Sequence, residues 1–323
     1  MSVLVYIENF GGKLKKQNFE LASFASKLAE STNSTAKALI LGTISNAEIE
    51  KLNQFGIEKI IKVEGESFNV RINKVFTQVI EQVVLKENAS MVLFPDNNTG
   101  KALAPRLSVR LRAGFVSGVV SLPESYNPFI IIKRAFSGKA IAKVKINTPT
   151  KILSLAINSF GLHEKPVTLK IESFETQVSI ADAPIKMVER KLSENKVSLF
   201  DADIVVSGGR GMRGPENWKP LEDLATVLGA ATACSRPVSD DGWRSHEEHV
   251  GQTGKIIAPN LYIAVGISGA TQHVAGVSRS KCLVAINTDS DAPIFEVANY
   301  GILGDAQKIL PKLTEAFKAF KGE

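Results

Sequence analysis

Short apolar runs alternate with segments of helical period along most of this chain, and this alternation constrains the fold more than any other feature. The runs "SVLVYI", "AKALILG", "EKIIKV" and "SMVLFP" are separated by stretches such as the one carrying Leu21, Phe24, Ala25 and Leu28 at helical spacing. Strands that alternate with helices build a parallel sheet covered by helices. The first half of the chain is therefore predicted to be an α/β domain.

From about Val116 the pattern changes, because four strand-like runs follow one another with no helical segment between them. These runs are "VSGVVSL", "FIIIKRAF", "AIAKVKI" and "KILSLAI". Consecutive strands joined by short turns usually pair antiparallel. We expect all four to form an antiparallel extension of the first sheet.

Polar and charged residues dominate between about Ser179 and Leu199, as in "KMVERKLSENK", which is typical of a linker. After it, alternation restarts with "ADIVVSGG" and continues through "GAATAC", "LYIAVG" and "CLVAIN". The sequence thus predicts two α/β domains, each a mostly parallel sheet flanked by helices. We expect a Rossmann-like domain at residues 1–185, a hinge at 186–199 and a doubly wound domain at 200–323.

The chain is expected to end in a helix whose first turn contains Pro311, a position where proline costs no hydrogen bond. Helical spacing then predicts that Leu313, Ala316, Phe317 and Phe320 form its buried face.

Composition excludes several classes of protein. No apolar run approaches the ~20 residues that span a bilayer, and "MSVLVYIENF" leads into a strand without a basic leader, so we expect a cytoplasmic protein that is not membrane-embedded. The formal net charge is +6, but the lysines are dispersed and not interleaved with aromatic residues, so no nucleic-acid partner is expected. Cys234 and Cys282 lack CxxC spacing, which predicts buried free thiols.

Three motifs in the second half resemble known catalytic or binding signatures but depart from each. "GISGA" lacks the second glycine of a hydrolase nucleophile elbow, because Ala270 stands there. "HEEH" spaces His246 and His249 three apart, where the zinc-protease motif has four, so no metal site is expected. "GQTGK" lacks both the first glycine and the hydroxyl residue of a P-loop.

One signature is matched, since Gly209, Gly211 and Gly214 satisfy G-x-G-x-x-G after the strand "DIVVS". A dinucleotide fold of that type has an acidic residue at the end of its second strand, whereas the strand "AATAC" is followed by Ser235 and Arg236. Arginine there suits the 2′-phosphate of NADP. An NADP-dependent oxidoreductase is therefore an alternative function.

Polar, glycine-bearing turns follow several strands of the second half. They are "SGGRGM", "CSRPVSDDGW", "HVGQTGK" and "GISGATQH", with "AINTD" and "YGILGDA" after them. Ligands of open α/β sheets bind beyond the carboxyl ends of strands, and pyrophosphate favours backbone amides at helix N-termini. The turns together predict a dinucleotide site.

These turns, in this order and spacing, resemble the flavin domain of the electron transfer flavoprotein α subunit. The likeness is most specific in "VGQTGKIIAPNLYIAVGISGATQHVAG" and "VAINTDSDAPIFEVANYGILGD". In the first half, "GKALAPRLSVRL" and "RAFSGKAIAKV" look like the family's first domain. The resemblance covers the whole chain.

The resemblance implies an FAD-containing electron carrier, not an enzyme, which forms a heterodimer with a β subunit. FAD would accept electrons from acyl-CoA and related dehydrogenases in transient complexes, as in fatty acid β-oxidation, and pass them to electron transfer flavoprotein-quinone oxidoreductase. The first domain would then be a scaffold and β-subunit dock. The resemblance leaves open whether the β subunit binds AMP or a second, bifurcating FAD.

The resemblance also implies which residues contact FAD. Carried over position by position, they are Arg210, Ser235, Arg236, Val250, Gly251, Gln252, Thr253, Ser268, Gly269, Ala270, Thr271, Gln272, His273, Asn287, Asp305 and Ala306.

Each of these residue types suits a part of the cofactor. Arg236 as a cation over the flavin and His273 at its edge would stabilise negative charge around N1 and O2, while the Thr253 hydroxyl would bond N5. Alternatively, Arg236 only pairs with a nearby acid such as Asp240 or Asp241. The turn residues Ser268, Gly269 and Gln272 would hold the ribityl chain and pyrophosphate. The adenosine end would be held by Asn287 and Asp305, although Asn287 could instead only cap the turn after "CLVAI".

Two positions depart from the family's pattern. Pro237 follows the arginine where many members have a small residue, and Asn299 in "VANYG" stands where the family commonly has aspartate. The first fixes the backbone beside Arg236, and the second puts any charge role at that position in doubt.

Overall fold

The computed structural model describes residues 2–138, 140–178, 185, 188–189 and 198–322. The chain divides into two compact units, Met1–Lys191 and Leu192–Glu323. Both are α/β, as predicted, and each is described by itself below. The expected hinge at 186–199 lies outside the described residues apart from positions 188–189 and 198–199, so the domain limits and the hinge stay predictions.

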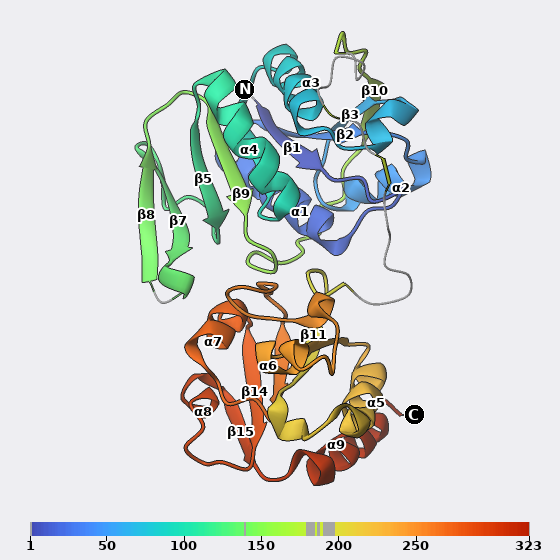
Figure 1. Cartoon of the computed structure of the whole chain (residues 1–323). Coiled ribbons are helices and arrows are strands. Elements are labelled where there is room, and N and C mark those ends of the chain that lie inside the picture. Colours follow the sequence, from blue (N-terminus) through green and yellow to red (C-terminus); the bar gives the residue numbers. More distant parts are fainter. Residues whose placement is uncertain (1, 139, 179–184, 186–187, 190–197, 323) are drawn as a thin grey trace. The chain divides into compact units, whose positions relative to one another are not determined.

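The first unit is built on a ten-stranded, mostly parallel sheet (Figure 1) with the order β10-β3-β2-β1-β4-β9-β5-β7-β6 and β8 paired to β7. Its strands are β1 (Ser2–Ile7), β2 (Thr35–Leu41), β3 (Lys59–Val63), β4 (Ala89–Pro95), β5 (Gly114–Val119), β6 (Ser125–Tyr126), β7 (Phe129–Ala135), β8 (Ala140–Ile146), β9 (Lys151–Leu155) and β10 (Lys170–Ser173).

Helices cover both faces of this sheet, because side chains of a strand alternate between its faces. On β1, Val3 and Val5 pack in one core with α1, whereas Leu4 and Tyr6 pack in the other with α3 and α4. The α-helices are α1 (Lys16–Ser31), α2 (Asn46–Glu50), α3 (Asn73–Lys86) and α4 (Asn98–Leu111), and short 3₁₀ turns are η1 (Lys51–Gln54), η2 (Glu66–Asn69) and η3 (Phe136–Gly138).

The expected antiparallel extension is wrong for "KILSLAI". This run forms β9, which lies between β4 and β5 and pairs parallel with both. Four of its five residues are buried, as in a central strand covered on both faces. The antiparallel part consists of β6, β7 and β8 with the end of β5.

The second unit has a five-stranded, wholly parallel sheet in the order β12-β11-β13-β14-β15. The strands are β11 (Ile204–Gly208), β12 (Ala231–Cys234), β13 (Leu261–Val265), β14 (Cys282–Asn287) and β15 (Tyr300–Leu303). Its helices are α5 (Lys219–Leu228), α6 (Arg236–Asp240), α7 (Thr271–Val277), α8 (Ile294–Val297) and α9 (Ala306–Lys321), with 3₁₀ turns η5 (Arg210–Met212), η6 (Pro215–Asn217) and η7 (His246–Glu248).

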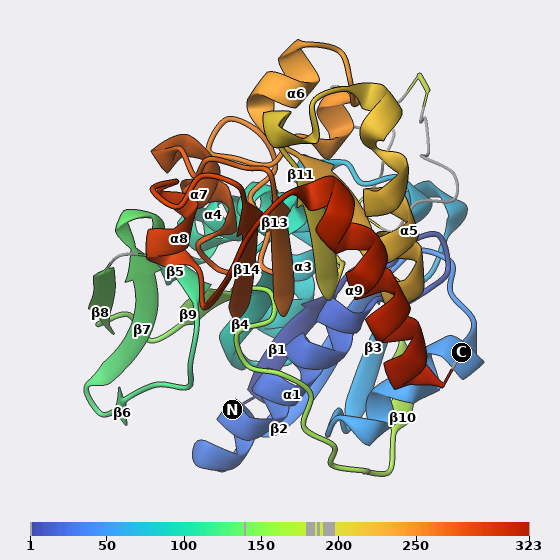
Figure 2. The same cartoon turned by 90° about the horizontal axis from the view of Figure 1, so that it is seen from below.

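Two cores hold this sheet between its helices. Figure 2 shows α5 and α9 together on one face, where Leu221 and Leu310 are fully buried. On the other face, α7 and α8 contribute Val277 and Ile294 to the second core. The doubly wound second domain is therefore confirmed.

The C-terminal helix begins earlier than expected. Asp305 caps α9 by accepting a hydrogen bond from the Gln307 amide at 3.0 Å, so Pro311 is the sixth residue of the helix and not part of its first turn. Phe320 is 88% exposed, and Ala316 is exposed as well, so the predicted buried face extends only to Leu313 and Phe317.

Among the described residues, no helix is long and apolar enough to cross a membrane. Both cysteines are free thiols, with Cys234 buried and Cys282 partly buried. Burial raises the pKa of the Cys234 thiol to about 12, and the Glu248 carboxylate acts in the same direction.

Candidate functional site

The second unit contains a cavity of about 550 Å³ at the carboxyl ends of its strands. The turns after β11, β12, β13 and β14 and the loop at 249–253 supply its walls. Twelve of the sixteen residues singled out by the sequence line it: Arg210, Ser235, Arg236, Val250, Gly251, Gln252, Thr253, Ser268, Ala270, Gln272, His273 and Asn287.

The cavity lies at the switch point of the doubly wound sheet. From β11 the chain proceeds to β12 on one side, and it then returns to β13 on the other. The connections that leave β11 and β13 therefore run in opposite directions across the sheet. This divergence opens a crevice between the two strands, and ligands bind in such crevices.

Glycines let the turns after β11 and β13 approach each other. A Cβ at Gly209 or Gly211 would collide with the backbone of Gly266, which itself has φ +60°. Gly211 donates to the Gly266 carbonyl at 3.0 Å, and Gly209 to that of Val265 at 2.8 Å. Close packing of two turns thus accounts for the first two glycines of the G-x-G-x-x-G match.

The turn after β12 places Arg236 at the edge of the cavity as the first residue of α6. Pro237 occupies the next position of the helix, where no intrahelical N–H is needed. The Arg236 Nε donates to Asp240 Oδ2 at 3.2 Å, and the arginine side chain remains 62% exposed. The cation is therefore partly compensated by a carboxylate that also lines the cavity.

A partly buried ion cluster anchors the loop that leads into the cavity at 249–253. Arg244 donates to both carboxylate oxygens of Glu248, at 2.9 and 3.0 Å, and to Glu222 at 2.8 Å. Its guanidinium also lies over the ring of Trp218, with 5.5 Å to the centroid. Although burial opposes the charge, the bonds to Glu248 and Glu222 raise the pKa of Arg244.

The turn after β13 is shaped by a glycine that no other residue can replace without strain. Gly269 has φ +90°, and a Cβ there would collide with the backbone of Ile294. The Ile294 amide donates to the Ser268 carbonyl at 2.9 Å, which ties this turn to α8. The Gln252 amide donates to the Gln272 carbonyl at 2.7 Å and joins the loop at 249–253 to α7.

His273 is buried on α7 and lines the cavity. Burial, with the nearby His249 acting in the same direction, lowers the pKa of His273 to about 4. The imidazole is therefore neutral at pH 7. It can serve the flavin edge as a hydrogen-bonding group, and not as the cation that an unperturbed histidine could become.

Asn287 caps the turn after β14 and also lines the cavity. Its Oδ1 accepts from the Asp289 amide at 3.1 Å, and its Nδ2 donates to the Ile267 carbonyl at 3.0 Å. Asn287 therefore both caps the turn and forms part of the cavity wall.

Four of the predicted residues do not line the cavity: Gly269, Thr271, Asp305 and Ala306. Asp305 accepts a hydrogen bond from Arg213 Nη2 at 3.2 Å in addition to capping α9. Ala306 is buried in the core beneath that helix. Contacts of these four residues with a ligand stay predictions.

Sequence reasoning missed several residues of the cavity wall: Gly211, Pro237, Asp240, His249, Gly266, Ile267, Asp289, Ala292 and Pro293. His249 is the most informative, because burial and the Arg236 charge lower its pKa. It begins the turn "HVGQTGK", which was the available signal, although the resemblance did not imply that it contacts FAD.

Asn299 has a structural role. Its Oδ1 accepts from the Leu283 amide at 2.8 Å, while its own amide donates to the Leu283 carbonyl at 2.8 Å. An aspartate would supply the same acceptor oxygen, so this position needs an acceptor and not a charge.

No group of three or more metal-ligating side chains occurs in the described part of the chain.

A doubly wound parallel domain with a glycine-lined cavity at its switch point is typical of proteins that bind a dinucleotide. The electron transfer flavoprotein domain matches residues 3–179, and the electron transfer flavoprotein FAD-binding domain matches residues 198–278. The chain belongs to the electron transfer flavoprotein family, in its α-subunit branch.

Relatives of nearly equal length share about a third of the sequence. The electron transfer flavoprotein subunit alpha of Bacillus subtilis is 34% identical over 98% of this chain and 97% of its own length. That of Thermoanaerobacterium thermosaccharolyticum is 33% identical over 99% and 98%. The mitochondrial one of Dictyostelium discoideum is 33% identical over 98% and 92%.

The family establishes FAD as the cofactor and electron carriage as the activity, so the chain is not an enzyme and the NADP-dependent alternative is wrong. The cavity suits FAD chemically. The guanidinium groups of Arg210 and Arg236 favour its negative charge, while the apolar walls at Val250 and Ile267 suit a planar ring.

Proposed function

We propose that this chain is the FAD-containing subunit of a heterodimeric electron carrier that takes electrons from acyl-CoA and related dehydrogenases and delivers them to a quinone oxidoreductase. The observation that supports this most is that Arg236, Thr253 and His273 line one cavity of the family's FAD-binding domain. When bound there, FAD supplies one- and two-electron redox chemistry.

The residues of the chain would divide the work of holding the cofactor. Arg236 adds positive charge at the cavity edge, which favours a flavin that gains negative charge on reduction. Thr253 offers a hydroxyl on the exposed loop, and His273 offers a neutral imidazole at a fixed position. The turns at Ser268 and Gln272 would hold the ribityl chain and pyrophosphate, and Asn287 would lie toward the adenosine end, with Asp305 beyond the cavity wall.

The partner would be a β subunit, since the relatives named above are alpha subunits of electron transfer flavoproteins. The first unit would serve as its dock, and the hinge at 186–199 would let the flavin domain meet different redox partners. A cytoplasmic location and a part in fatty acid β-oxidation belong to the same proposal.

Copurification of the chain with its β subunit tests this function. We expect a yellow complex whose cofactor, released by denaturation, is FAD by mass spectrometry. An acyl-CoA dehydrogenase with its substrate should reduce this flavin, and NADPH should not. A complex that dithionite reduces but no acyl-CoA dehydrogenase reduces would contradict the proposed donors, whereas a colourless complex would contradict the carrier role.

A further inference from the structure

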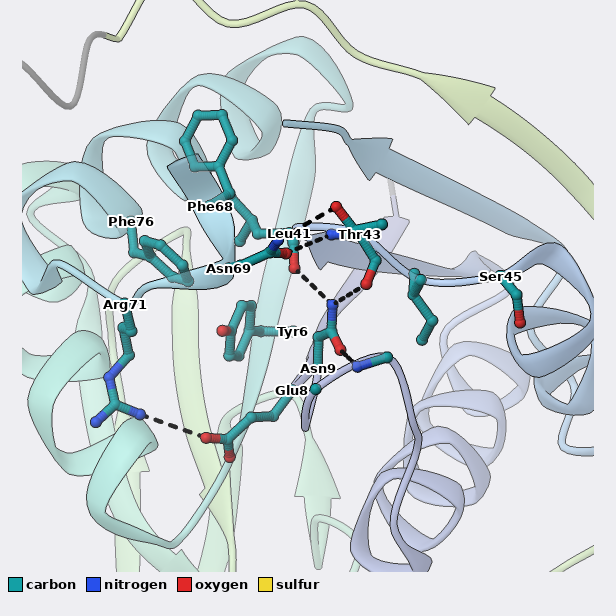
Figure 3. Close-up of a pocket in the computed structure, with 13 residues that line it drawn as sticks. Tyr6, Glu8, Asn9, Leu41, Thr43, Ser45, Phe68, Asn69, Arg71 and Phe76 are labelled. Atoms are coloured by element: carbon teal, nitrogen blue, oxygen red, sulfur yellow. Dashed lines mark hydrogen bonds and ion pairs between the residues drawn. The ribbon is translucent and has the colours of Figure 1, made fainter. Parts of the chain in front are cut away.

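The first unit contains its own cavity of about 460 Å³, far along the chain from the flavin residues. Figure 3 shows its walls, which come from the ends of β1 and β2, from the segments that follow β1, β2 and β3, and from α3. Three aromatic side chains, Tyr6, Phe68 and Phe76, line it together with Glu8 and Arg71. A volume of this size lies within the range of small-molecule sites.

The position of the cavity in the sheet is one where ligands bind. From β1 the chain proceeds through β2 to β3 on one side, and β4 then pairs with β1 on the other, so the order is β3-β2-β1-β4. The part β3-β2-β1 has the strand order of a mononucleotide-binding half of a doubly wound fold, in which ligands bind beyond the carboxyl ends of the strands. The cavity lies beyond those ends of β1, β2 and β3, and Glu8 and Asn9 follow the end of β1 directly.

Two asparagines fix the frame of the cavity. Asn9 Nδ2 donates to the Thr43 carbonyl at 3.0 Å, and its Oδ1 accepts from the Gly12 amide at 2.7 Å. Asn69 Oδ1 accepts from the Thr43 amide at 2.7 Å, close to Gly42, whose φ is +91°. The segments after β1, β2 and β3 are thus bonded to one another, and the cavity keeps its shape without a ligand.

One polar group of a buried residue opens on this cavity and has no partner in the described part of the chain. Tyr6 is only 3% exposed, and its hydroxyl makes no hydrogen bond to any described residue. In Figure 3 the hydroxyl points toward the side where Phe76 and Arg71 lie. Burial, together with the Glu8 carboxylate, raises the pKa of Tyr6. The hydroxyl therefore stays protonated and can donate a hydrogen bond. The hydroxyl is accessible from the cavity, so it can donate a hydrogen bond to an acceptor of a ligand there.

Arg71 supplies a second set of donors. Its Nη1 donates to Glu8 Oε1 at 3.3 Å and to the Thr99 hydroxyl, while its Nε and Nη2 have no partner in the described part of the chain. Glu8 is occupied by protein, since it also accepts from Thr99 and from Asn97 Nδ2, the latter at 2.8 Å. Arg71 therefore offers unused N–H groups to an anion, whereas Glu8 does not offer an unused carboxylate.

We propose that this cavity is a second ligand site, which binds a molecule with the chemistry of a nucleoside monophosphate: a planar heterocycle joined to an anionic group. The aromatic side chains face the heterocycle, the Tyr6 hydroxyl donates to one of its acceptors, and Arg71 binds the anion. The site is independent of the proposed electron-carrier function, because none of its residues belongs to the flavin cavity.

Photolabelling of the FAD-loaded complex with 8-azido-AMP tests the site. Trypsin should release residues 1–13 and 63–71 as separate peptides, which together carry Tyr6, Phe68 and Arg71. We expect mass spectrometry to find the label on one or both peptides and excess AMP to abolish it. Adenosine should compete at least ten-fold more weakly than AMP, because it lacks the anion.

Three variants of matched design complete the test. Tyr6→Phe removes only the hydroxyl and should lower labelling about three- to ten-fold, and Arg71→Gln should lower it at least ten-fold. Arg110→Gln, which removes a guanidinium paired to Glu81 on the same unit but outside the cavity, should leave labelling unchanged. All three should keep full FAD content.

Labelling confined to other peptides, or unchanged in both cavity variants, would overturn the site. Equal competition by adenosine and AMP would overturn the assignment of Arg71 to an anion. Neither result would bear on electron transfer, which the reduction of bound FAD by an acyl-CoA dehydrogenase measures separately.

Discussion

The hydroxyl of Tyr262 lies 2.8 Å from Nε2 of His273, and both side chains are buried. This contact joins the start of β13 to the first turn of α7, so the imidazole that lines the flavin cavity has a fixed orientation before any cofactor binds. Its neutrality at pH 7 follows from the same burial.

The neutral His273 should make stability depend on pH. In the unfolded chain the pKa of His273 is near 6.5, and in the folded chain it is near 4. The contribution of the neutral imidazole to stability is therefore fully present above about pH 6.5 and is lost as the pH drops toward 4. The total loss is about 3 kcal/mol at 1.36 kcal/mol per pKa unit. We expect His273→Gln to remove this slope, as judged from melting temperatures of the complex at pH 7.5 and 5.0. An equal fall in both proteins would show that His273 is not the cause.

Arg236 should set the reduction potential of the flavin. Unit charges ~4 Å apart interact by about 4 kcal/mol at an effective dielectric of ~20, or roughly 170 mV for one electron, and solvent lowers this bound. Since Arg236 is largely exposed and paired, we expect Arg236→Gln to lower the first reduction potential by tens of millivolts to about 100 mV, measured by spectroelectrochemical titration.

Two further variants distinguish the effect of a charge beside the flavin from the effect of the net charge of the domain on the reduction potential. Asp240→Asn should raise the potential, because it removes the carboxylate that compensates Arg236. Arg213→Gln removes an equally exposed cation that lies outside the cavity wall, and it should change the potential by only a few millivolts. If Arg236→Gln and Arg213→Gln shifted the potential alike, the assigned role of Arg236 would be withdrawn.

The ion cluster around Arg244 should matter for both stability and cofactor retention. Arg244→Met leaves the buried Glu248 without its cation, which costs about 3–5 kcal/mol in comparable buried pairs. Because this cluster precedes the loop at 249–253, we expect a lower melting temperature and faster loss of FAD on gel filtration. The double variant Arg244→Met with Glu248→Gln should recover part of the stability. If it recovered none, the uncompensated charge of Glu248 would not be the main cause of the loss.

Gly269 should tolerate no side chain. A methyl group there meets the Ile294 backbone in addition to the strain of φ +90°, so Gly269→Ala should destabilise the second unit by several kcal/mol. Gly242→Ala is the control, since Gly242 has φ +73° but open space around it, and the expected cost is about 1 kcal/mol. Similar melting temperatures for the two variants would show that crowding at Ile294 is relieved at little cost.

Local pattern predicted the order of strands and helices well, but it did not predict which strands pair. The run that forms β9 reads as one more member of a series of hairpins, and only the packed sheet shows that its residues lie between β4 and β5. Its largely apolar character, broken only by Ser154 after the opening lysine and in contrast to the alternation of β8, was a usable signal of a strand buried on both faces.

The flavin cavity was predictable because its residues lie in turns with specific chemistry, and parallel strands bring their carboxyl ends to one edge. Ionisation was not predictable, since it depends on burial in the packed domain, whereas the pairing of Arg236 is local in sequence. The neutrality of His273 depends on burial. The compensation of Arg236 depends on the local turn of α6, which places Asp240 beside it. The cavity of the first unit was missed because Tyr6 and Arg71 belong to no recognised motif.

The contact between the turns after β11 and β13 has a consequence for how this sequence can vary. Gly209, Gly211 and Gly266 meet through backbone atoms alone, so none of the three can gain a side chain unless the other turn retreats. A library that randomises only one of the turns should therefore return almost nothing but glycine at these positions. Larger residues could be selected only from libraries in which both turns change length together.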